Sequence, residues 1–430
     1  MILMLKNLNE QEKVVLDKMH YLVGSAQILA DISKIAPKRP FDKAVLAFLN
    51  TVSKNLMKDT RSREYSDVVT LGFWLRKASL RRLEEKYGMN DEDIHFGRGV
   101  AFHIAPSNVP VNFAYSLVSG LLMGNANVVR IPSKDFPQVD IIAEAINNAI
   151  EGHEDMKNYI ILVRYGRDAE INDYLSSIAD SRIIWGGDQT IADIRKSALP
   201  PRSNEVTFAN RYSLAVIDSD EYVRMAVIKD EGDCEGIMQQ DNNEAKRIAQ
   251  DFYNDTYFSD QNACTSPRII IWVGDQKEAA KKIFWTELHK LVEEKYTFQA
   301  ITGINKLTSS YLTAVDEPGS KIIEHDDNLI IRVHVPRISN DIMRLMDNCG
   351  YFFEYDCDNI LDIRPLCDDK RCQTIGLLGN KDILKSLFDS GIKGVDRVAS
   401  FGHTMDFELI WDGYDLPAIL SRTIKFNMPD

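Results

Sequence analysis

The chain has 430 residues, 44% of them hydrophobic and 27% charged, with a formal net charge of −13. This composition is typical of a globular protein, and at this length two domains are expected, because a single core stops growing near about 250–300 residues. The acidic balance argues against a nucleic-acid-binding surface, which needs a basic field to displace counterions. The sequence contains no signal-peptide pattern and no apolar run of about 18 residues, so we expect a cytoplasmic protein without a membrane span.

The cysteine pattern argues against both a disulfide framework and a metal site. No pair has the CxxC spacing, so free thiols in a reducing compartment are expected. Four cysteines gather between 349 and 372, at spacings of eight, ten and five, which lack the close pairs that structural zinc uses. The six are Cys234, Cys264, Cys349, Cys357, Cys367 and Cys372.

The predicted elements begin with helices and continue with alternating strands and helices. Apolar residues three and four apart predict helices over 10–32, 41–57 and 65–88. Strand–helix alternation then predicts a parallel, doubly wound sheet. Its strands are expected at 99–105, 127–132, 159–165, 182–187 and 212–218, with helices at 110–123, 137–151, 168–178 and 188–197.

An acidic, polar stretch at 230–242 predicts the start of a second domain with the same alternation. The tail "WDGYDLPAILSRTIKFNMPD" is partly strand-like, which suits an edge strand or an oligomer contact. Strands are expected at 267–274, 328–335, 350–357 and 373–379, and helices at 243–254, 276–294, 337–347 and 381–390.

Two residues stand out as candidates for catalysis. Asn108 lies in "PSNVP", between a predicted strand and a predicted helix, where open α/β sheets bind ligands. Its amide could donate a hydrogen bond to a developing oxyanion, although Asn and Pro are also ordinary turn residues. Cys264 lies in the polar loop "FSDQNACTSPR", where a thiol can be exposed and ionised, although most cysteines are inert core residues.

Two turns are candidates for holding an anionic cofactor. "WGGDQT" places Gly186 and Gly187 between a strand and a helix, where glycines let the backbone approach a phosphate. "VVRIPSK" places Arg130, Ser133 and Lys134 at the end of another strand. A Gly-Gly turn and a solvated lysine are the alternative interpretations.

Taken in order, four stretches resemble the aldehyde dehydrogenase superfamily and, within it, the LuxC-type acyl-CoA reductases, the reductase component of bacterial fatty-acid reductase. They are "HIAPSNVPVNFAYSLVSGLLMGNANVVRIPSK", "WGGD", "DQNACTSPR" and "VDRVASFGHTMDFELIWDGYDL". The resemblance implies an α/β, aldehyde dehydrogenase-like fold of two doubly wound domains with a short oligomerisation tail. It implies N-terminal helices packing on the cofactor domain at 1–90, a dinucleotide-binding domain at 91–235, a catalytic domain at 236–410 and the tail at 411–430.

The resemblance also implies roles for individual residues. Cys264 falls on the family nucleophile and Asn108 on the oxyanion-hole amide, while Ser133 and Arg130 lie near the segment that contacts the adenosine ribose. Lys134 replaces the acid of NAD-using relatives, which favours NADPH, with NADH as the alternative. Gln373 matches, more loosely, a Glu that holds the nicotinamide ribose. The base of hydrolytic relatives is replaced by Thr207, with Glu205 two residues away.

The implied reaction is reduction of a fatty acyl thioester to the aldehyde, through a thioester on Cys264. The acyl donor is acyl-CoA or a partner acyl-protein synthetase, in a complex that could include a thioesterase, and a homo-oligomer is expected. Two alternatives stay open, an acyl-phosphate reductase of the glutamyl-phosphate reductase type and a non-catalytic scaffold. Acyl chain length and pathway, luminescence or another, are left open.

Overall fold

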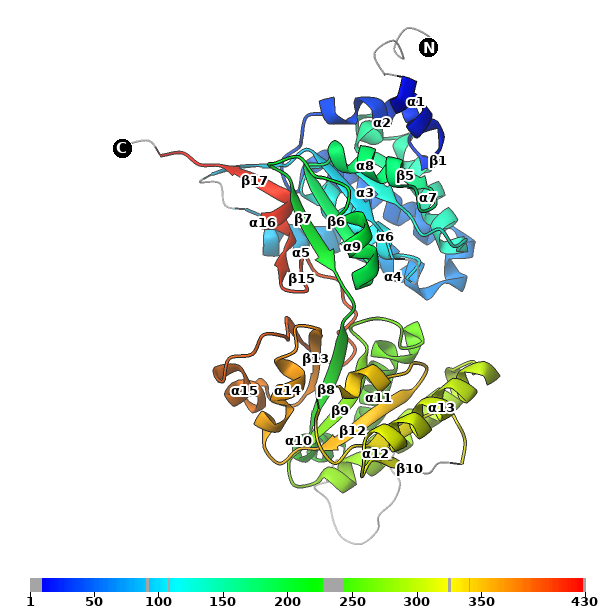
Figure 1. Cartoon of the computed structure of the whole chain (residues 1–430), viewed down its shortest axis with the longest axis vertical. Helices are drawn as coiled ribbons and strands as arrows, with labels where there is room; N and C mark the ends of the chain where they lie inside the picture. Colours follow the sequence, from blue (N-terminus) through cyan, green and yellow to red (C-terminus); the bar gives the residue numbers. More distant parts are fainter. Residues whose placement is uncertain are drawn as a thin grey trace. The chain divides into compact units, whose positions relative to one another are not determined.

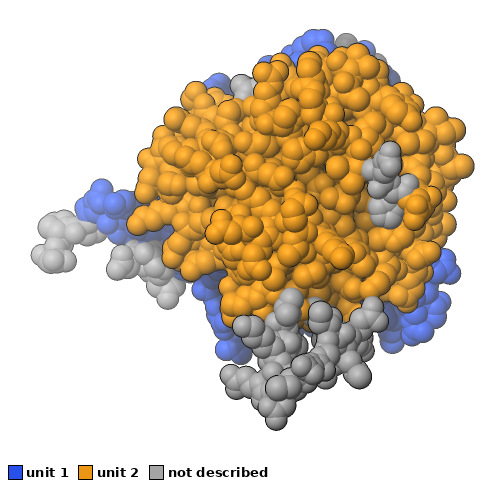
Figure 2. All heavy atoms as spheres, turned by 90° about the horizontal axis from the view of Figure 1, so that it is seen from below, with its two compact units in different colours: residues 1–209, 407–430 blue, residues 210–406 orange. Residues whose placement is uncertain are grey.

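The computed structural model describes residues 10–89, 93–106, 109–226, 243–323, 326–339 and 341–427. The chain divides into two compact units, coloured separately in Figure 2. Unit 1 comprises residues 1–209 and 407–430, and unit 2 comprises residues 210–406. The C-terminal segment therefore belongs to the same unit as the N-terminal half.

Unit 1 is built on a sheet that has six strands in the described residues, in the order β1-β5-β4-β3-β6-β7 (Figure 1). All neighbours are parallel except β1, which pairs antiparallel with β5. From β3 the chain continues outward to β4 and then to β5, and it returns to the other side of β3 with β6. The strand order therefore reverses between β3 and β6, and sheets of this kind bind ligands beside such a reversal. The strands are β1 (His20–Val23), β3 (Val100–Ile104), β4 (Ala126–Arg130), β5 (Ile160–Arg164), β6 (Ser181–Trp185) and β7 (Asn204–Phe208).

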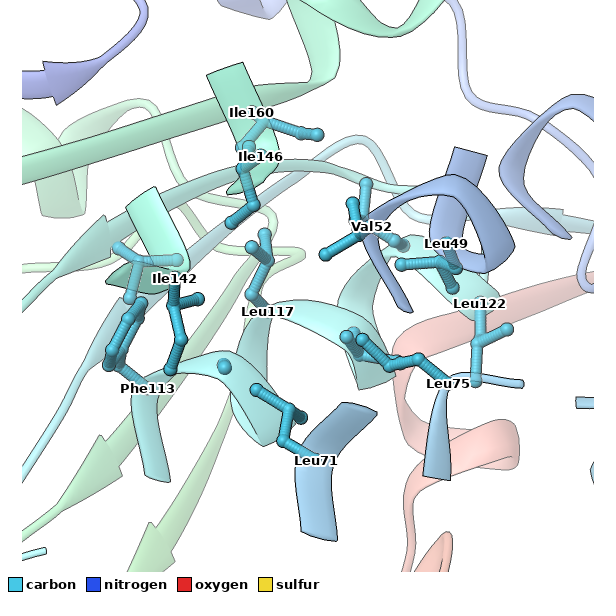
Figure 3. Close-up of a cluster of buried hydrophobic side chains, with 14 of the residues drawn as sticks. Leu49, Val52, Leu71, Leu75, Phe113, Leu117, Leu122, Ile142, Ile146 and Ile160 are labelled. Carbon is cyan, nitrogen blue, oxygen red and sulfur yellow. The ribbon is translucent and has the colours of Figure 1, made fainter. Parts of the chain in front are cut away.

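Helices cover the unit 1 sheet because its strands are apolar on both faces, as parallel strands usually are. Figure 3 shows one core, where Leu49 and Val52 of α3 meet Leu117 of α6 and Ile142 and Ile146 of α7. The helices are α1 (Glu10–Asp17), α2 (Ala26–Asp31), η2 (Ile32–Lys34), α3 (Lys43–Lys58), η3 (Thr60–Glu64), α4 (Ser66–Trp74), α5 (Lys77–Tyr87), α6 (Asn112–Leu122), α7 (Pro137–Ile150), η4 (Glu154–Tyr159), α8 (Ala169–Ser177) and α9 (Asp188–Ile194).

Unit 2 has a sheet with seven strands in the described residues, in the order β10-β11-β12-β9-β8-β13-β14. All neighbours are parallel except the edge strand β10. The amino ends of β9, β8 and β13 therefore lie at one edge of the sheet. The strands are β8 (Tyr212–Asp218), β9 (Pro267–Val273), β10 (Lys321–Ile323), β11 (Ile331–His334), β12 (Tyr351–Asp356), β13 (Cys372–Leu378) and β14 (Arg397–Ser400).

The two faces of the unit 2 sheet pack in two separate apolar cores. One contains Phe252, Trp272 and Phe284 under α11 and α12. Across the described residues of the chain, no helix combines the length and hydrophobicity needed to cross a bilayer. The helices of unit 2 are α10 (Ser219–Ala226), α11 (Asn243–Asp255), η5 (Tyr257–Ser259), α12 (Lys277–Lys295), α13 (Ala300–Asp316), η6 (Ile342–Leu345), η7 (Ile360–Ile363), α14 (Arg364–Cys367), η8 (Lys381–Leu384) and α15 (Lys385–Asp389).

The C-terminal tail adds small elements to unit 1. β17 (Ser421–Ile424) pairs antiparallel with β2 (Ile94–Gly97), from the segment just before the central strand β3. Asn125 connects the two regions, since its side chain donates to the Leu420 carbonyl at 2.9 Å and accepts from the Arg98 N–H at 2.7 Å. The other tail elements are β15 (Ile410–Trp411), β16 (Tyr414–Asp415) and α16 (Leu416–Leu420).

Four sequence-based expectations differ from the structure. The helix expected over 10–32 is interrupted by β1, which lies at the edge of the sheet. The helix expected over 337–347 is reduced to η6, and α13 was not predicted. The strand at 212–218 belongs to unit 2 because it pairs with β9 and β13. The predicted domain boundary after residue 235 therefore falls beyond the first strand and helix of unit 2, which begins at Asn210.

Candidate active site

Cys264 lies in the loop that connects η5 to β9, at the amino edge of the unit 2 sheet. It is partly exposed, whereas the other cysteines of the described residues are buried. Its carbonyl oxygen accepts a hydrogen bond of 2.7 Å from the Ser213 hydroxyl, which ties the loop to the start of β8. Among the described thiols, Cys264 is therefore the one that a substrate can reach. Cys234 lies outside the described residues.

Gln261 fastens this loop from inside. The residue is fully buried and has a left-handed backbone, with φ of 58°. Its side-chain nitrogen donates to the carbonyls of Pro267 and Tyr351 at 2.9 and 3.1 Å, and its side-chain oxygen accepts from the N–H groups of Gly350 and Tyr351 at 3.0 and 3.3 Å. One amide thus joins the Cys264 loop to the start of β9 and of β12. Sequence reasoning missed Gln261, because a glutamine in a polar loop gives no signal of burial.

Arg268 places a buried positive charge beside the same loop. The residue is the second of β9 and is 6% exposed. Its guanidinium donates to the Asp347 carbonyl at 2.7 Å and to the Asn348 side chain, which in turn donates to Asn262 at 2.7 Å. Burial lowers the pKa of Arg268 to about 10, whereas the negative charges of Asp347 and Cys264 act to raise it. The group therefore stays cationic at neutral pH. A cation so close to a cysteine favours nucleophilic chemistry at the sulfur.

Asp255 anchors a second segment of unit 2 to the end of α11. Its carboxylate is 1% exposed and accepts hydrogen bonds from the N–H groups of Gly402 and Thr404, at 2.7 and 3.1 Å. These residues belong to the closing "FGHT" motif of the sequence. Burial raises the pKa of Asp255 to about 7, Asp406 adds to the rise, and the two N–H groups oppose it. The carboxyl group therefore binds its proton more tightly in the folded chain than in the unfolded chain.

The substitution Asp255→Asn tests this proton. Because the pKa of Asp255 rises on folding, protonated Asp255 stabilises the folded chain. This stabilisation is fully present below about pH 4 and is lost as pH rises through about 7. We expect the free energy of unfolding of the wild type to fall by about 2–4 kcal/mol relative to Asp255→Asn across this window. Urea unfolding of both proteins between pH 5 and pH 8 measures the difference. The Asp255 charge also helps to raise the pKa of His403, so His403 contributes to the pH dependence of the difference. Parallel pH profiles would contradict the assignment.

The predicted cofactor residues of unit 1 lie at the carboxyl edge of its sheet. Arg130 ends β4, donates to the Gly166 carbonyl at 3.1 Å and stacks over Tyr165 at 4.6 Å from the ring centre. Ser133 and Lys134 follow it and are exposed. Gly186 and Gly187 follow β6 and are partly exposed. The structure thus brings these five predicted residues to one edge of one sheet. Asn108 lies outside the described residues.

Arg164 is a candidate that the sequence analysis missed. It ends β5, next to the end of β4, and one guanidinium nitrogen donates to Asp135 at 2.6 Å. Within the described residues, its Nε and second Nη atoms are buried without a hydrogen-bond partner. Unsatisfied buried donors of a cation are costly, and an anion at this edge would satisfy them. The sequence could have identified Arg164, since "YIILVRY" places an arginine at the end of a predicted strand, as "VVRIPSK" does.

Three further residues named in the sequence analysis lie on strands, one in unit 2 and two in unit 1. Gln373 lies near the start of β13, is 2% exposed, and shares the amino edge of the unit 2 sheet with the Cys264 loop, with β8 between them. Glu205 of β7 accepts from Arg182 at 2.8 Å and from Arg195 at 2.7 Å. Thr207, two residues later on β7, is partly exposed. The only carboxylate considered as a water-activating base is thus occupied by two arginines.

Comparison with solved structures identifies the fold. Aldehyde dehydrogenase 21 from Physcomitrella patens matches 97% of this chain and 90% of its own, with a TM-score of 0.62 and 11% identity. The glyceraldehyde-3-phosphate dehydrogenase GapN from Methanocaldococcus jannaschii, solved with NADP, matches 96% of this chain and 93% of its own, with a TM-score of 0.62 and 13% identity. The chain has the aldehyde dehydrogenase fold, as predicted.

The family follows from sequence comparison. The family model "Acyl-CoA reductase (LuxC)" matches residues 23–297, and the chain belongs to this family. A curated relative, the long-chain acyl-protein thioester reductase of Aliivibrio fischeri, is 21% identical over 335 residues, which cover 76% of this chain and 63% of the relative. The chain therefore spans less than two thirds of that relative's length. The predicted family is confirmed.

Proposed function

We propose that this protein reduces a fatty acyl thioester to the aldehyde with NADPH, through an acyl thioester on Cys264. The observation that carries the proposal is the single accessible thiol of the described residues, held on a loop by Gln261 and flanked by Arg268. The family name and the A. fischeri relative, a long-chain acyl-protein thioester reductase, support the substrate class. The donor is acyl-CoA or an acyl group on a partner acyl-protein synthetase.

In the first step the Cys264 sulfur attacks the thioester carbon of the donor. A carbon–sulfur bond to Cys264 forms, the bond to the donor sulfur breaks, and the donor leaves as its thiol. When bound, NADPH would supply a hydride to the carbon of the new thioester. The Asn108 amide and the Cys264 N–H would hold the negative oxygen that develops on this carbon. The carbon–sulfur bond would then break, which releases the aldehyde and leaves Cys264 as its thiolate, and a proton from solvent restores the thiol.

The pairing of the one carboxylate considered as a base favours reduction over hydrolysis. Water-dependent release of the acyl group would need a carboxylate near the thioester, and Glu205 is held in ion pairs with Arg182 and Arg195. Thr207 has no basic group. An acyl group on Cys264 would therefore persist until a hydride or another thiol reaches it.

The carboxyl edge of unit 1 suits an anionic dinucleotide. Arg130, Lys134 and the unsatisfied nitrogens of Arg164 would bind its phosphates, and Ser133 would bind the ribose. Gly186 and Gly187 leave room for the backbone to approach the cofactor. On unit 2, Gln373 would contact the nicotinamide ribose. Lys134 would meet the 2′-phosphate of NADPH, since it is exposed and replaces the acid that excludes this group in NAD-using relatives.

The substitution Lys134→Glu tests the cofactor preference. Reversing the charge should raise the KM for NADPH by about tenfold and change the KM for NADH much less, because only NADPH carries the 2′-phosphate. Steady-state kinetics with each cofactor measure the split. Lys157→Glu is the matched control, since Lys157 is an exposed lysine of η4, which precedes β5 and so lies toward the opposite edge of the sheet. Equal KM changes for both cofactors in Lys134→Glu would contradict the role.

The experiment for the function itself is intact-protein mass spectrometry with a panel of acyl-CoAs, followed by NADPH and peptide mapping. We expect an acyl adduct on the Cys264 peptide that NADPH removes as aldehyde. Adducts only from acyl-phosphates would favour the glutamyl-phosphate reductase type, and no adduct from any donor would favour the scaffold. The synthetase and thioesterase partners, the homo-oligomer and the cytoplasmic location stay predictions.

A further inference from the structure

The helix α13 has its polar and apolar faces inverted. Along its inner face Lys306, Ser310 and Thr313 are fully buried. Along its outer face Ile304 is 62% exposed, and Val315 is 77% exposed. A surface helix of a globular protein normally buries its apolar stripe and exposes its polar residues. The inversion calls for two explanations, one for each face.

The inner face is polar because it binds backbone near the Cys264 loop. The Lys306 ammonium group donates to the carbonyls of Asn328, Leu329 and Cys349, at 2.7, 3.0 and 2.7 Å. Burial lowers the pKa of Lys306 to about 8. The Thr313 hydroxyl bonds Tyr351 at 2.9 Å at the start of β12. These contacts fix which side of the helix faces the sheet, so the apolar residues are directed outward.

The outer face is the largest concentration of exposed apolar side chains in the described residues. Six of the sixteen large apolar residues that are exposed there lie on this one helix. Their spacing follows the three-and-four rhythm of a helix–helix seam, with Thr308 at the centre. Between 300 and 315 the only charged residue is the buried Lys306. The six, called here the α13 stripe, are Ile301, Ile304, Leu307, Tyr311, Leu312 and Val315.

We propose that the α13 stripe is an interface between two copies of this chain. The chain carries a formal charge of −13, so two copies repel one another, and they can approach most closely at a surface without exposed charge. A charged partner would need complementary charges on this surface, and the stripe has none. A helix of the same period, with the same neutral stripe, fits this surface, and α13 of a second copy is such a helix.

The size of the stripe is sufficient for a dimer. The exposed fractions of its six side chains amount to roughly 600 Å², at the upper end of the apolar patch that a typical monomer exposes. Two copies would bury about 1,200 Å², at the lower limit of a standard interface. Figure 1 shows α13 as a long helix at the periphery of unit 2, and it contacts β10, β11 and η6 on its inner side.

The two helices would cross antiparallel about a two-fold axis at Thr308. A symmetric dimer uses the same surface on both copies, and antiparallel helices also oppose their dipoles favourably. Thr308 of one copy then lies opposite Thr308 of the other, and Ile304 lies opposite Leu312. Ala314, six residues from the axis, lies about 18 Å from its equivalent in the other copy.

Sedimentation velocity of the full chain tests the interface. We expect the double variant Ile304→Glu, Leu307→Glu to halve the assembly mass of the wild type, because four acids would then face one another. Phe388→Glu on α15 is the control, since it places a charge on another exposed apolar residue of unit 2. Its mass should equal that of the wild type. A monomeric wild type, or a double variant with unchanged mass, would overturn the proposal. Binding of a monomeric wild type to lipid vesicles would assign the stripe to a membrane instead.

A disulfide trap tests the register without disturbing the apolar residues. Under mild oxidant Thr308→Cys should form about tenfold more disulfide-linked dimer than Ala314→Cys, because only the former brings two sulfurs within bonding distance. Both positions are exposed, and the wild type reports the background from its own cysteines. Non-reducing electrophoresis measures the yield. Equal yields from the two variants, or a higher yield from Ala314→Cys, would overturn the antiparallel arrangement.

Discussion

Replacing Cys264 by serine is expected to abolish the acyl adduct and to lower aldehyde formation by a factor of about 10⁴ or more. A serine hydroxyl has a far higher pKa than a thiol, and Glu205, the carboxylate considered as a base, is held by two arginines. Intact-mass measurement with acyl-CoA gives the adduct, and NADPH oxidation gives the rate. Binding of NADPH, followed by fluorescence, should be unchanged because the residues proposed to hold its phosphates lie on unit 1.

Cys357→Ser is the matched control for this prediction. Cys357 is buried beyond the other end of the same sheet, and burial raises its pKa to about 12, so it is not expected to act as a nucleophile. The control should form the adduct on Cys264 as the wild type does. An adduct that persists in Cys264→Ser and disappears in Cys357→Ser would contradict the assignment of Cys264 as the nucleophile.

Replacing Gln261 by leucine is expected to give the second largest effect, on stability and on acylation together. The change leaves two carbonyls and two N–H groups buried without their partner amide, on a residue with φ of 58°. We expect the free energy of unfolding to fall by about 3–5 kcal/mol, since each unsatisfied buried group costs about 1–3 kcal/mol. Acylation of Cys264 should slow by about tenfold or more, because the loop is no longer held.

Urea unfolding and the rate of adduct formation measure the two effects. Gln250→Leu is the control, because Gln250 is a partly buried glutamine of α11 whose amide bonds only neighbouring side chains. Its free energy of unfolding should change by about 0.5 kcal/mol or less. Gln261→Glu retains the acceptor for Gly350 and Tyr351 and should lose less stability than Gln261→Leu. Normal acylation in a stable Gln261→Leu protein would show that the loop positions Cys264 without this amide.

The regular alternation of strands and helices was predictable because its signal is local. Short β-branched runs such as "PRIIIWVG", bounded by a proline and a glycine, favour buried strands, and the amphipathic helices between them carry a period of 3.6. The failures arose where the deciding partner is distant in sequence. The segment 20–23 becomes a strand because β5, about 140 residues away, offers an edge. The helix α13 was not predicted although its apolar residues have helical spacing, and only the folded chain shows that these residues face outward.

The residues of the candidate site also fall into two groups, those that the sequence could identify and those that only the structure could. Cys264, Lys134 and the glycines after β6 could be named from residue chemistry, their place after predicted strands and the resemblance to a family. Gln261, Arg268 and Arg164 acquire their importance from burial, and burial depends on which carbonyls and charges the folded chain brings against them. The amino-acid order alone therefore established the family, the fold class and the candidate nucleophile. The tertiary structure decided which polar groups are enclosed, and thus which of them hold the nucleophile in place, because burial is a property of distant contacts and not of local pattern.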